Sequence, residues 1–283
     1  MKIFSDSTIK KINLYIRNGY NMRIDVGLSY NGPYLIKWVK TNKKNIVIGF
    51  EPHPQSFENL KIKISEFPKK TRDRIFIFNY AISNVSVPTS KKFFSTGVPN
   101  TALDPGASSL LKPIKLLKNS VVETFRVRVI PLDYFLNRIN YKIIEFIKID
   151  TQGSDLAVLK SLNSHIRKVH MIQAERDCTD YYDKAASGNE LDEFMIRNNF
   201  TQVGHTKNKL DSLFINTLIP VLDFVPPRFI IVIRKFPKTL GKFVIKSPIV
   251  FTRTILVSIF YDLNVNLHIY FLRLKHLIKI LLK

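Results

Sequence analysis

The sequence predicts an α/β fold in which helices cover a doubly wound, mostly parallel β-sheet. Short β-rich runs alternate with segments of helical periodicity from Met22 to about Asn216, which is the pattern of strands joined by crossover helices. Two of these runs, IIEFIKI and VHMIQA, are almost continuously apolar, as central strands buried on both faces are. With 283 residues and a hydrophobic content of 45%, the chain can bury a sizeable core, which excludes a disordered protein.

The runs predict seven strands and the helices between them. Helices are expected to start near Pro33, Pro54, Ser154 and Asn189, because proline in a first turn, or Ser and Asn at a cap, satisfies unpaired backbone groups. The last two strands lie close enough in sequence to form a hairpin. The expected strands cover residues 22–26, 46–51, 74–82, 143–150, 169–175, 201–205 and 212–216.

The chain divides into three expected parts. A helical extension over residues 1–21 precedes the sheet domain, which covers residues 22–217. Within the domain, residues 84–132 interrupt the alternation with Pro, Gly and Ser and contain a further strand at 124–130. Such a long excursion is commonly a lid or a substrate-binding insert. Residues 218–283 form a basic, partly amphipathic C-terminal extension with eleven Lys or Arg and two Asp.

The basic composition bears on partners and not on the fold. The formal net charge is +22, from 44 basic and 22 acidic residues. Nucleic acid, an anionic membrane surface and an acidic substrate are all candidate partners for such a charge. A coding bias toward Lys, Ile and Asn explains it equally well. Charge alone therefore does not choose among these readings.

The single cysteine and the absence of long apolar runs bear on the compartment. Cys178 excludes an intrachain disulfide and a cysteine metal cluster, which fits a reducing compartment. The first ten residues, MKIFSDSTIK, lack the apolar stretch of a secretory signal. Apolar runs such as 229–233 and 255–257 end far short of the ~20 residues of a membrane span. We therefore expect a cytoplasmic protein, with peripheral attachment to a membrane left open.

A glycine-containing turn and a distant carboxylate together indicate a nucleoside site. The segment from Asp25 to Gly32 follows the first strand and precedes a helix, and Gly27 and Gly32 allow a tight turn that a ligand can approach closely. Glu51 ends the next strand about 25 residues on, where a carboxylate can accept both ribose hydroxyls. An ordinary turn is the alternative reading of the glycines alone. The combination favours a bound nucleoside.

The most specific motif follows the fourth predicted strand. The stretch FIKIDTQGSDLAVLKS, residues 146–161, places Asp150 at the carboxyl end of a buried strand, the edge where open α/β sheets bind ligands. It resembles the signature of the FkbM family of methyltransferases, which usually reads IKIDVEG-x-E-x-x-VLKG. The resemblance covers roughly residues 22–217. Its other pieces, in order, are the DVG turn, FEPHP with Glu51, NYAIS at 79–83, Ser108-Ser109-Leu110, VIPLDYFL, Glu175 and DSLFIN.

The resemblance implies a Rossmann-like class I methyltransferase fold, with S-adenosylmethionine as methyl donor and O-methylation of hydroxyls on small molecules or sugars. By the same resemblance, the residues that bind the cofactor are assigned in three groups. Asp25, Gly27 and Ser29 line its methionine end, Glu51 binds the ribose, and Ala81 with Ile82 lines the adenine.

The chain departs from the usual family pattern in two places. Its glycine loop reads D-x-G-x-x-x-x-G, one residue longer than the usual D-x-G-x-x-x-G. Thr151 and Gln152 stand before Gly153 where the family usually has Val-Glu, so a carboxylate near the expected active site is missing.

Asp150 and Glu175 are the candidate catalytic residues. An alcohol that attacks a methyl group must lose a proton, which a carboxylate can accept or a divalent ion can make more acidic. The two residues end adjacent predicted strands, so their oxygens are also candidate ligands of Mg²⁺. Helix capping and loop hydrogen bonds are the alternative reading. His170 is expected to be a core residue and Asp133 a helix cap.

The C-terminal extension ends in a predicted basic amphipathic helix. Its apolar residues recur with 3,4 spacing, and its Lys and Arg residues fall elsewhere on the helical wheel. This helix is suited to lie on an anionic membrane, and packing on its own domain or on a second subunit is an equal alternative. The apolar stripe consists of Leu267, Tyr270, Leu274, Leu277 and Leu281, widened by Phe271 and Ile278.

Three functions are consistent with these features. The leading one is O-methylation of a hydroxylated small molecule or glycan, which the motif around Asp150 supports. The second is methylation of a nucleic acid, which the high positive charge supports. The insert, however, offers only Phe93 and Phe94 beside Lys91 and Lys92 for base stacking. The third is a non-catalytic binding protein of methyltransferase fold, attached to a membrane surface by its tail, for the altered glycine loop.

Overall fold

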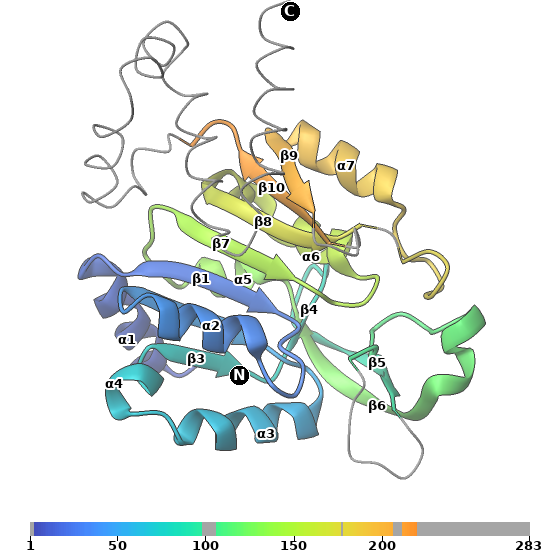
Figure 1. Ribbon diagram of the computed structural model, residues 1–283, viewed down its shortest axis with the longest axis horizontal. Helices are drawn as coiled ribbons and strands as arrows, with labels where there is room; N and C mark the ends of the chain where they lie inside the picture. The colour runs from blue at the N-terminus through green and yellow to red at the C-terminus, as the bar shows by residue number, and fades with distance from the viewer. Residues whose placement is uncertain (1–2, 98–105, 177, 206–210, 220–283) are drawn as a thin grey trace, which may run out of the picture. The chain divides into compact units, whose positions relative to one another are not determined.

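The computed structural model describes residues 3–97, 106–176, 178–205 and 211–219. The chain divides into two units, Met1–Leu218 and Ile219–Lys283. The helices and strands labelled in Figure 1 lie in the first unit. The predicted amphipathic helix of the C-terminal extension lies outside the described residues.

A seven-stranded sheet forms the centre of the domain, in the order β3-β2-β1-β7-β8-β10-β9. The first five of these strands run parallel, and β10 runs antiparallel to both β8 and β9. This is the doubly wound sheet with a C-terminal hairpin that the sequence predicts. The strands are β1 (Asn21–Val26), β2 (Asn45–Phe50), β3 (Ile75–Phe78), β7 (Ile144–Ile149), β8 (Val169–Glu175), β9 (Phe200–His205) and β10 (Asp211–Asn216).

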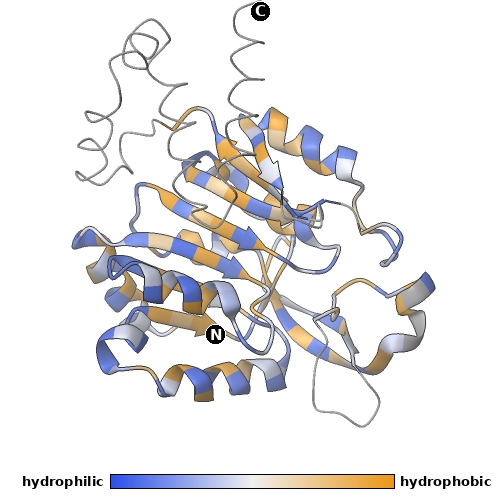
Figure 2. Ribbon diagram, in the orientation of Figure 1, coloured by the Kyte–Doolittle hydropathy of each residue, from blue (hydrophilic) through white to orange (hydrophobic). Residues whose placement is uncertain are grey.

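Helices cover both faces of the sheet, so the core forms two layers. One layer packs α1 (Asp6–Arg17), α5 (Leu132–Leu136), α6 (Asp155–Lys160) and α7 (Gly188–Arg197) against the strands. The other packs α2 (Pro33–Thr41) and α3 (Pro54–Ser65) against the opposite face. Figure 2 shows apolar residues concentrated along the central strands, with polar residues on the outer sides of the helices. Three further helices lie among the described residues: α4 (Lys69–Arg72), η1 (Lys115–Ser120) and η2 (Asn163–Lys168).

The helix starts agree with the sequence signals. Pro33 and Pro54 occupy the first turns of α2 and α3, and Ser154 is the N-cap residue of α6. Helix α7 begins at Gly188, one residue before the expected position, because Ser187 and Glu190 form a capping box there. The prediction that Asp133 caps a helix is wrong: Pro131 holds the cap position of α5, and the Asp133 carboxylate accepts a hydrogen bond from Asn163.

The prediction of a single strand over residues 74–82 is wrong, because this segment forms two strands that belong to different sheets. Strand β3 ends at Phe78, and β4 (Ala81–Ile82) pairs with β6 (Val121–Ile130). Between them, the Asn79 side chain donates to the carbonyl oxygens of Glu51 and Pro52. This hydrogen bonding holds the chain at the tip of β2 and turns it away from the main sheet.

The insert contributes two of the three strands of a second sheet, whose order is β4-β6-β5. Strand β5 (Thr89–Thr96), which the sequence did not predict, runs antiparallel to β6. The strand predicted over residues 124–130 is the later part of the longer β6. In Figure 1 this ribbon projects from the edge of the main sheet where the parallel strands end. The insert is therefore placed beside the edge at which open α/β sheets bind ligands.

None of the helices among the described residues is long and apolar enough to span a bilayer.

Candidate active site

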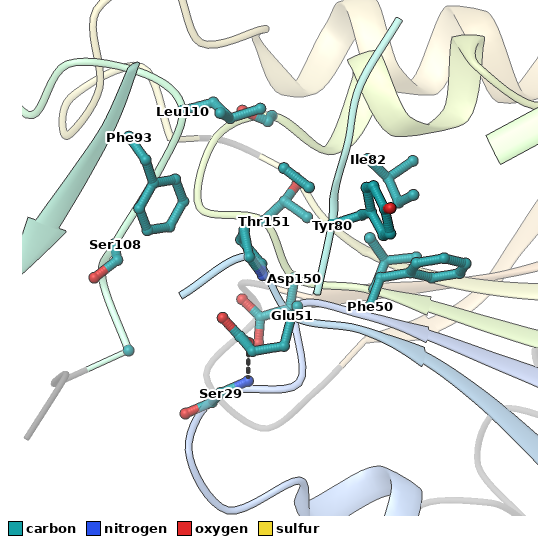
Figure 3. A pocket seen from close by; sticks show the side chains of 16 residues that line it. Ser29, Phe50, Glu51, Tyr80, Ile82, Phe93, Ser108, Leu110, Asp150 and Thr151 are labelled. Atoms are coloured by element: carbon teal, nitrogen blue, oxygen red, sulfur yellow. Dashed lines mark hydrogen bonds between the residues drawn. The ribbon is translucent and has the colours of Figure 1, made fainter. Parts of the chain in front are cut away.

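A pocket of about 580 Å³, part of it open to solvent, lies where β1, β2 and β7 end. Figure 3 shows Glu51 and Asp150 close together near Ser29, with Phe93, Ser108 and Leu110 from the insert across the pocket. The lining residues are Val26, Gly27, Ser29, Phe50, Glu51, Pro52, Tyr80, Ala81, Ile82, Phe93, Gly106, Ser108, Leu110, Asp150, Thr151 and Ser154.

The turn after β1 requires glycine at position 27. Gly27 has φ +82°, and a Cβ atom on it would lie 1.9 Å from the backbone oxygen of Asp150. No larger residue fits, because both the backbone conformation and the space exclude a side chain. Ser29 also has a positive φ, of 57°. The turn after β1 is thereby packed directly on the backbone at the end of β7.

Glu51 links the two turns that border the pocket. Its side chain is buried, with the residue 4% exposed. One carboxylate oxygen accepts the backbone N–H of Ser29 at 2.8 Å and the other accepts that of His53 at 2.9 Å. An ionised carboxylate has about four lone-pair positions. Glu51 can thus fix both turns and still offer acceptors to a ligand.

The adenine-side residues expected from the resemblance, Ala81 and Ile82, both line the pocket. They are buried and lie on β4, the short strand that the sequence merged with β3. Phe50 and Tyr80 complete an apolar wall beside them. This part of the pocket suits a flat apolar ring.

Two of the cofactor residues expected from the sequence do not line the pocket. Asp25 is 1% exposed, lies beside the backbone of Leu35 near the start of α2, and forms an ion pair with Lys148. Burial raises the pKa of Asp25 to about 6, against the opposing charge of Lys148. Gly32 has φ +52° and occupies the N-cap position of α2, with Leu60 packed against it. Both residues shape the turn from behind the pocket.

Asp150 and Glu175, the candidate catalytic residues, both lie beside Gln152. Its Nε2 donates to Oδ1 of Asp150 at 2.7 Å and contacts Oε2 of Glu175 at 3.5 Å. The Tyr182 hydroxyl lies 3.1 Å from the amide oxygen of Gln152 and 2.7 Å from the carbonyl oxygen of Ala107, so these two acceptors share its one proton. The residue that replaces the usual family glutamate therefore bridges the two candidate carboxylates.

The two carboxylates face different spaces. Asp150 lines the main pocket, and its side chain is 39% exposed. Glu175 lines a separate, smaller pocket beside Cys178. Burial, together with the charges of Asp155 and Asp150, raises the pKa of Glu175 to about 7. Of the two, Asp150 is the one that a ligand in the main pocket would meet.

The described residues include no group of three or more His, Cys, Asp and Glu side chains arranged to hold a metal ion. Oδ1 of Asp150 and Oε2 of Glu175 both contact Nε2 of Gln152, which donates hydrogen bonds. The described residues therefore give no support to a Mg²⁺ site at Asp150 and Glu175.

The side chain that sequence reasoning missed is Lys148. It stands inside the apolar run of β7, and its Nζ lies 3.1 Å from Oδ2 of Asp150 and 3.0 Å from the carbonyl oxygen of Gly27. Burial alone would lower the pKa of Lys148, but Asp25 and Asp150 raise it above its ordinary value. A charged residue within a continuous apolar strand was the signal that a partner was present.

The insert is tied to the segments after β7 and after β8 by two hydroxyl groups. Ser109 Oγ donates to the carbonyl oxygen of Gln152 at 2.7 Å. The Tyr182 hydroxyl donates to the carbonyl oxygen of Ala107 at 2.7 Å. On the other side, the ring of His53 contacts Phe125 and hydrogen-bonds Ser95 at 3.0 Å. The walls contributed by the insert are thus held to the loop after β2 on one side and to the segments after β7 and β8 on the other.

Comparison with known proteins identifies the sequence family. The model of the methyltransferase FkbM domain matches residues 25–202, and none of the curated proteins matches the sequence. Among solved structures, methyltransferase FkbM from Methylobacillus flagellatus KT is similar, with 16% identity and a TM-score of 0.44 over 69% of this chain. The match spans 43% of that protein, so this chain covers less than half of its length.

Two further solved structures share lower similarity. A human methyltransferase 10 domain containing protein has 11% identity and a TM-score of 0.35, over 74% of this chain and 77% of its own. Precorrin-6y C5,15-methyltransferase from Geobacter metallireducens GS-15 has 10% identity and a TM-score of 0.34, over 76% and 89%. The family model is the finding that carries the assignment, because it matches more than half of the chain. This chain belongs to the FkbM methyltransferase domain family.

Proposed function

We propose that this domain transfers a methyl group from S-adenosylmethionine to a hydroxyl oxygen of a small molecule or glycan. The observation that carries the proposal is a pair of carboxylates on one pocket, Glu51 at the end of β2 and Asp150 at the end of β7. Family membership supports the cofactor. The hydroxyl acceptor is supported by the resemblance of the motif around Asp150 to the family signature.

The pocket has groups suited to each part of the cofactor. Glu51 is a buried acceptor that can take both ribose hydroxyls in charge-assisted hydrogen bonds. Ala81 and Ile82 offer an apolar surface to the adenine. At Gly27 and Ser29 the pocket wall is a turn, and the missing Cβ of Gly27 lets a ligand approach the backbone closely.

S-adenosylmethionine supplies a methyl group on a positively charged sulfur, which an oxygen nucleophile can displace in line. Asp150 is the pocket carboxylate that can accept the proton of an attacking hydroxyl. Lys148 and Gln152 each donate to one of its oxygens, which holds the carboxylate in one orientation. The insert residues Phe93 and Leu110 cover the pocket and reduce its contact with water.

Glu175 is the second candidate for the proton acceptor. Its raised pKa of about 7 lies near the operating pH at which a general base works best. Gln152 connects it to Asp150 but also separates it from the main pocket. We therefore assign Glu175 the supporting role and Asp150 the direct one.

The test separates cofactor binding from turnover by two substitutions. Asp150→Asn should keep cofactor affinity, measured by calorimetry, and lower turnover by about 100-fold or more, because an amide is not a general base. Glu51→Gln should weaken binding, because each charge-assisted hydrogen bond contributes about 1.5–3 kcal/mol. Glu58→Gln, an exposed carboxylate on α3, is the control and should match wild type in both measurements.

Turnover is measured with methyl-labelled cofactor and separate pools of glycans, small molecules, lipids and RNA. Label in glycans or small molecules supports the proposal, whereas label in RNA alone contradicts the acceptor class. A wild-type protein that releases no heat with the cofactor would contradict the proposed activity and favour the non-catalytic alternative. Loss of turnover in Glu175→Gln, with Asp150→Asn fully active, would reverse the two roles. Inhibition by a chelator would show that a metal takes part.

A further inference from the structure

Lys148 is a buried amine that lies beneath the floor of the pocket. Its side chain is 7% exposed, and it faces Asp25 in the register between β1 and β7. The Nζ atom lies 3.0 Å from the carbonyl oxygen of Gly27, 3.1 Å from Oδ2 of Asp150 and 3.6 Å from Oδ1 of Asp25. The ring of Tyr34 lies 5.4 Å away on a further side. One ammonium group thus contacts both strands at the point where they end.

A buried charge destabilises a fold unless it is paired and hydrogen-bonded. Neutralising Asp25 explains one of the three contacts of Lys148. The other two go to the carbonyl of the glycine turn and to the pocket-facing carboxylate of Asp150. These two groups belong to different strands, and they are the groups that border the reacting part of the pocket. Because both groups bind the same ammonium group, Lys148 holds them in place relative to each other.

We propose that Lys148 is a positioning residue, which holds the turn at Gly27 and the carboxylate of Asp150 in one fixed arrangement. This inference rests on the proposed function, in which the turn binds the cofactor and Asp150 accepts the proton. Lys148 does not line the pocket and does not touch a reacting atom. Its effect is geometric, because an in-line transfer tolerates little displacement between the methyl donor and the acceptor oxygen.

The same two strands provide a matched control. Arg23 on β1 and Glu145 on β7 form another buried ion pair, with Nε and Oε2 2.8 Å apart and side chains 6% and 8% exposed. This pair lies at the start of the strands, away from the pocket. Arg23→Met therefore removes a buried cation from the same strand pair without altering the pocket.

The first readout is amide hydrogen exchange in the free protein, which needs no cofactor. Lys148→Met should speed exchange at residues 27–29 and 150–152 by about tenfold or more, because local opening becomes easier there. Arg23→Met should leave those amides at the wild-type rate. Equal exchange in Lys148→Met and wild type would overturn the positioning role.

The second readout is catalysis, and a double variant isolates the positioning effect. Lys148→Met should reduce turnover by about 100-fold and weaken cofactor binding. Lys148→Arg keeps the charge but not the geometry, and so should restore stability and only part of the turnover. The double variant Asp25→Asn/Lys148→Met removes both buried charges, so it should be more stable than Lys148→Met. Its turnover should stay low, because the contacts to Gly27 and Asp150 are still missing. The Asp25→Asn single variant is the reference for that comparison.

Recovery of wild-type turnover and affinity in the double variant would overturn the inference, because Lys148 would then only neutralise Asp25. If Lys148→Met does not fold, the double variant and Lys148→Arg carry the same comparison. A wild-type protein that binds no cofactor contradicts the proposed function, and hydrogen exchange still decides whether Lys148 holds the two segments.

Discussion

His170 is an ionisable residue that the folded protein keeps neutral. It lies on β8 among apolar neighbours and is 1% exposed, in agreement with its expected place in the core. Burial lowers the pKa of His170 to about 4, because a charged imidazole loses its hydration there. The unfolded chain has an ordinary histidine at this position, with a pKa near 6.5. The difference makes His170 a source of acid sensitivity.

The sign of this effect follows from proton binding. Between about pH 6.5 and pH 4 the unfolded chain binds a proton that the folded chain does not, so stability falls as the pH falls. The contribution of His170 is complete above pH 6.5 and decreases by up to about 3 kcal/mol toward pH 4. Urea unfolding at pH 7, 6 and 5 gives the free energy of unfolding of wild type and of His170→Leu, and the difference between the two proteins should change with pH. Asp25, Asp155 and Glu175, whose pKa values are raised, act on both proteins and cancel. Parallel curves for the two proteins would contradict the assignment.

Two side-chain hydroxyls help to hold the insert over the pocket, beside backbone hydrogen bonds to residues 181 and 183. The segment around Ser108 and Leu110 lines the pocket. Ser109 connects this segment to the loop after β7, and Tyr182 connects it to the chain after β8. Both contacts are made by single hydroxyl groups. Each such hydrogen bond contributes about 0.5–1.5 kcal/mol, which is small compared with the packing of the main sheet. Loss of either hydroxyl contact should therefore leave the domain folded.

We expect Ser109→Ala and Tyr182→Phe to affect ligand binding more than stability. Each variant should raise the KM for the acceptor, while the free energy of unfolding falls by no more than about 1.5 kcal/mol. Ser120→Ala is the matched control, because that hydroxyl donates only to Leu117 within the insert's own helix η1. A double-mutant cycle of Ser109 and Tyr182 tests whether the two contacts act together. Unchanged KM values in both variants would show that these contacts do not position the insert for binding.

At the scale of the whole molecule, the sheet domain and the C-terminal extension form separate units. Strand β10 ends at Asn216, and the chain is then fixed by hydrogen bonds from Thr217 to the carbonyl of Asn199 and from the Leu218 N–H to Asn216. A chain that ends at Leu218 keeps all of these contacts. The extension carries eleven Lys or Arg and two Asp, so much of the positive charge would be removed with it.

We expect a variant truncated after Leu218 to fold and to lose affinity for anionic membranes. Basic residues near an anionic leaflet contribute about 1 kcal/mol each, and an apolar helix stripe adds to the binding. Co-sedimentation with vesicles of phosphatidylserine and phosphatidylcholine, at low and high salt, compares the full chain with the truncated one. The full chain should bind, and less so at high salt. Binding that survives truncation unchanged would contradict a membrane role for the extension, and aggregation of the truncated domain would indicate that the extension packs on it.

The sequence by itself determined the main sheet and the identity of the family. Strands such as β2 and β7 are continuous apolar runs, and Pro33, Pro54 and Ser154 mark helix starts through local backbone chemistry. These signals are local, so they can be recognised without knowing which strand lies beside which. The motif around Asp150 is likewise contiguous, and it carried the family assignment that the family model confirms.

Only the tertiary structure decided how these pieces meet. Residues 74–82 form one β-rich run in the sequence, yet β4 leaves β3 to pair with β6, about fifty residues away. In the sequence, Lys148 is only a charged residue within an apolar strand. The fold shows that its partners are the carbonyl of Gly27 and the carboxylate of Asp150. Asp25 and Gly32 belong to the glycine turn in sequence, but packing puts them behind the pocket. The physical reason is that strand pairing and buried hydrogen bonds join residues far apart in the chain, and no local pattern specifies their partners.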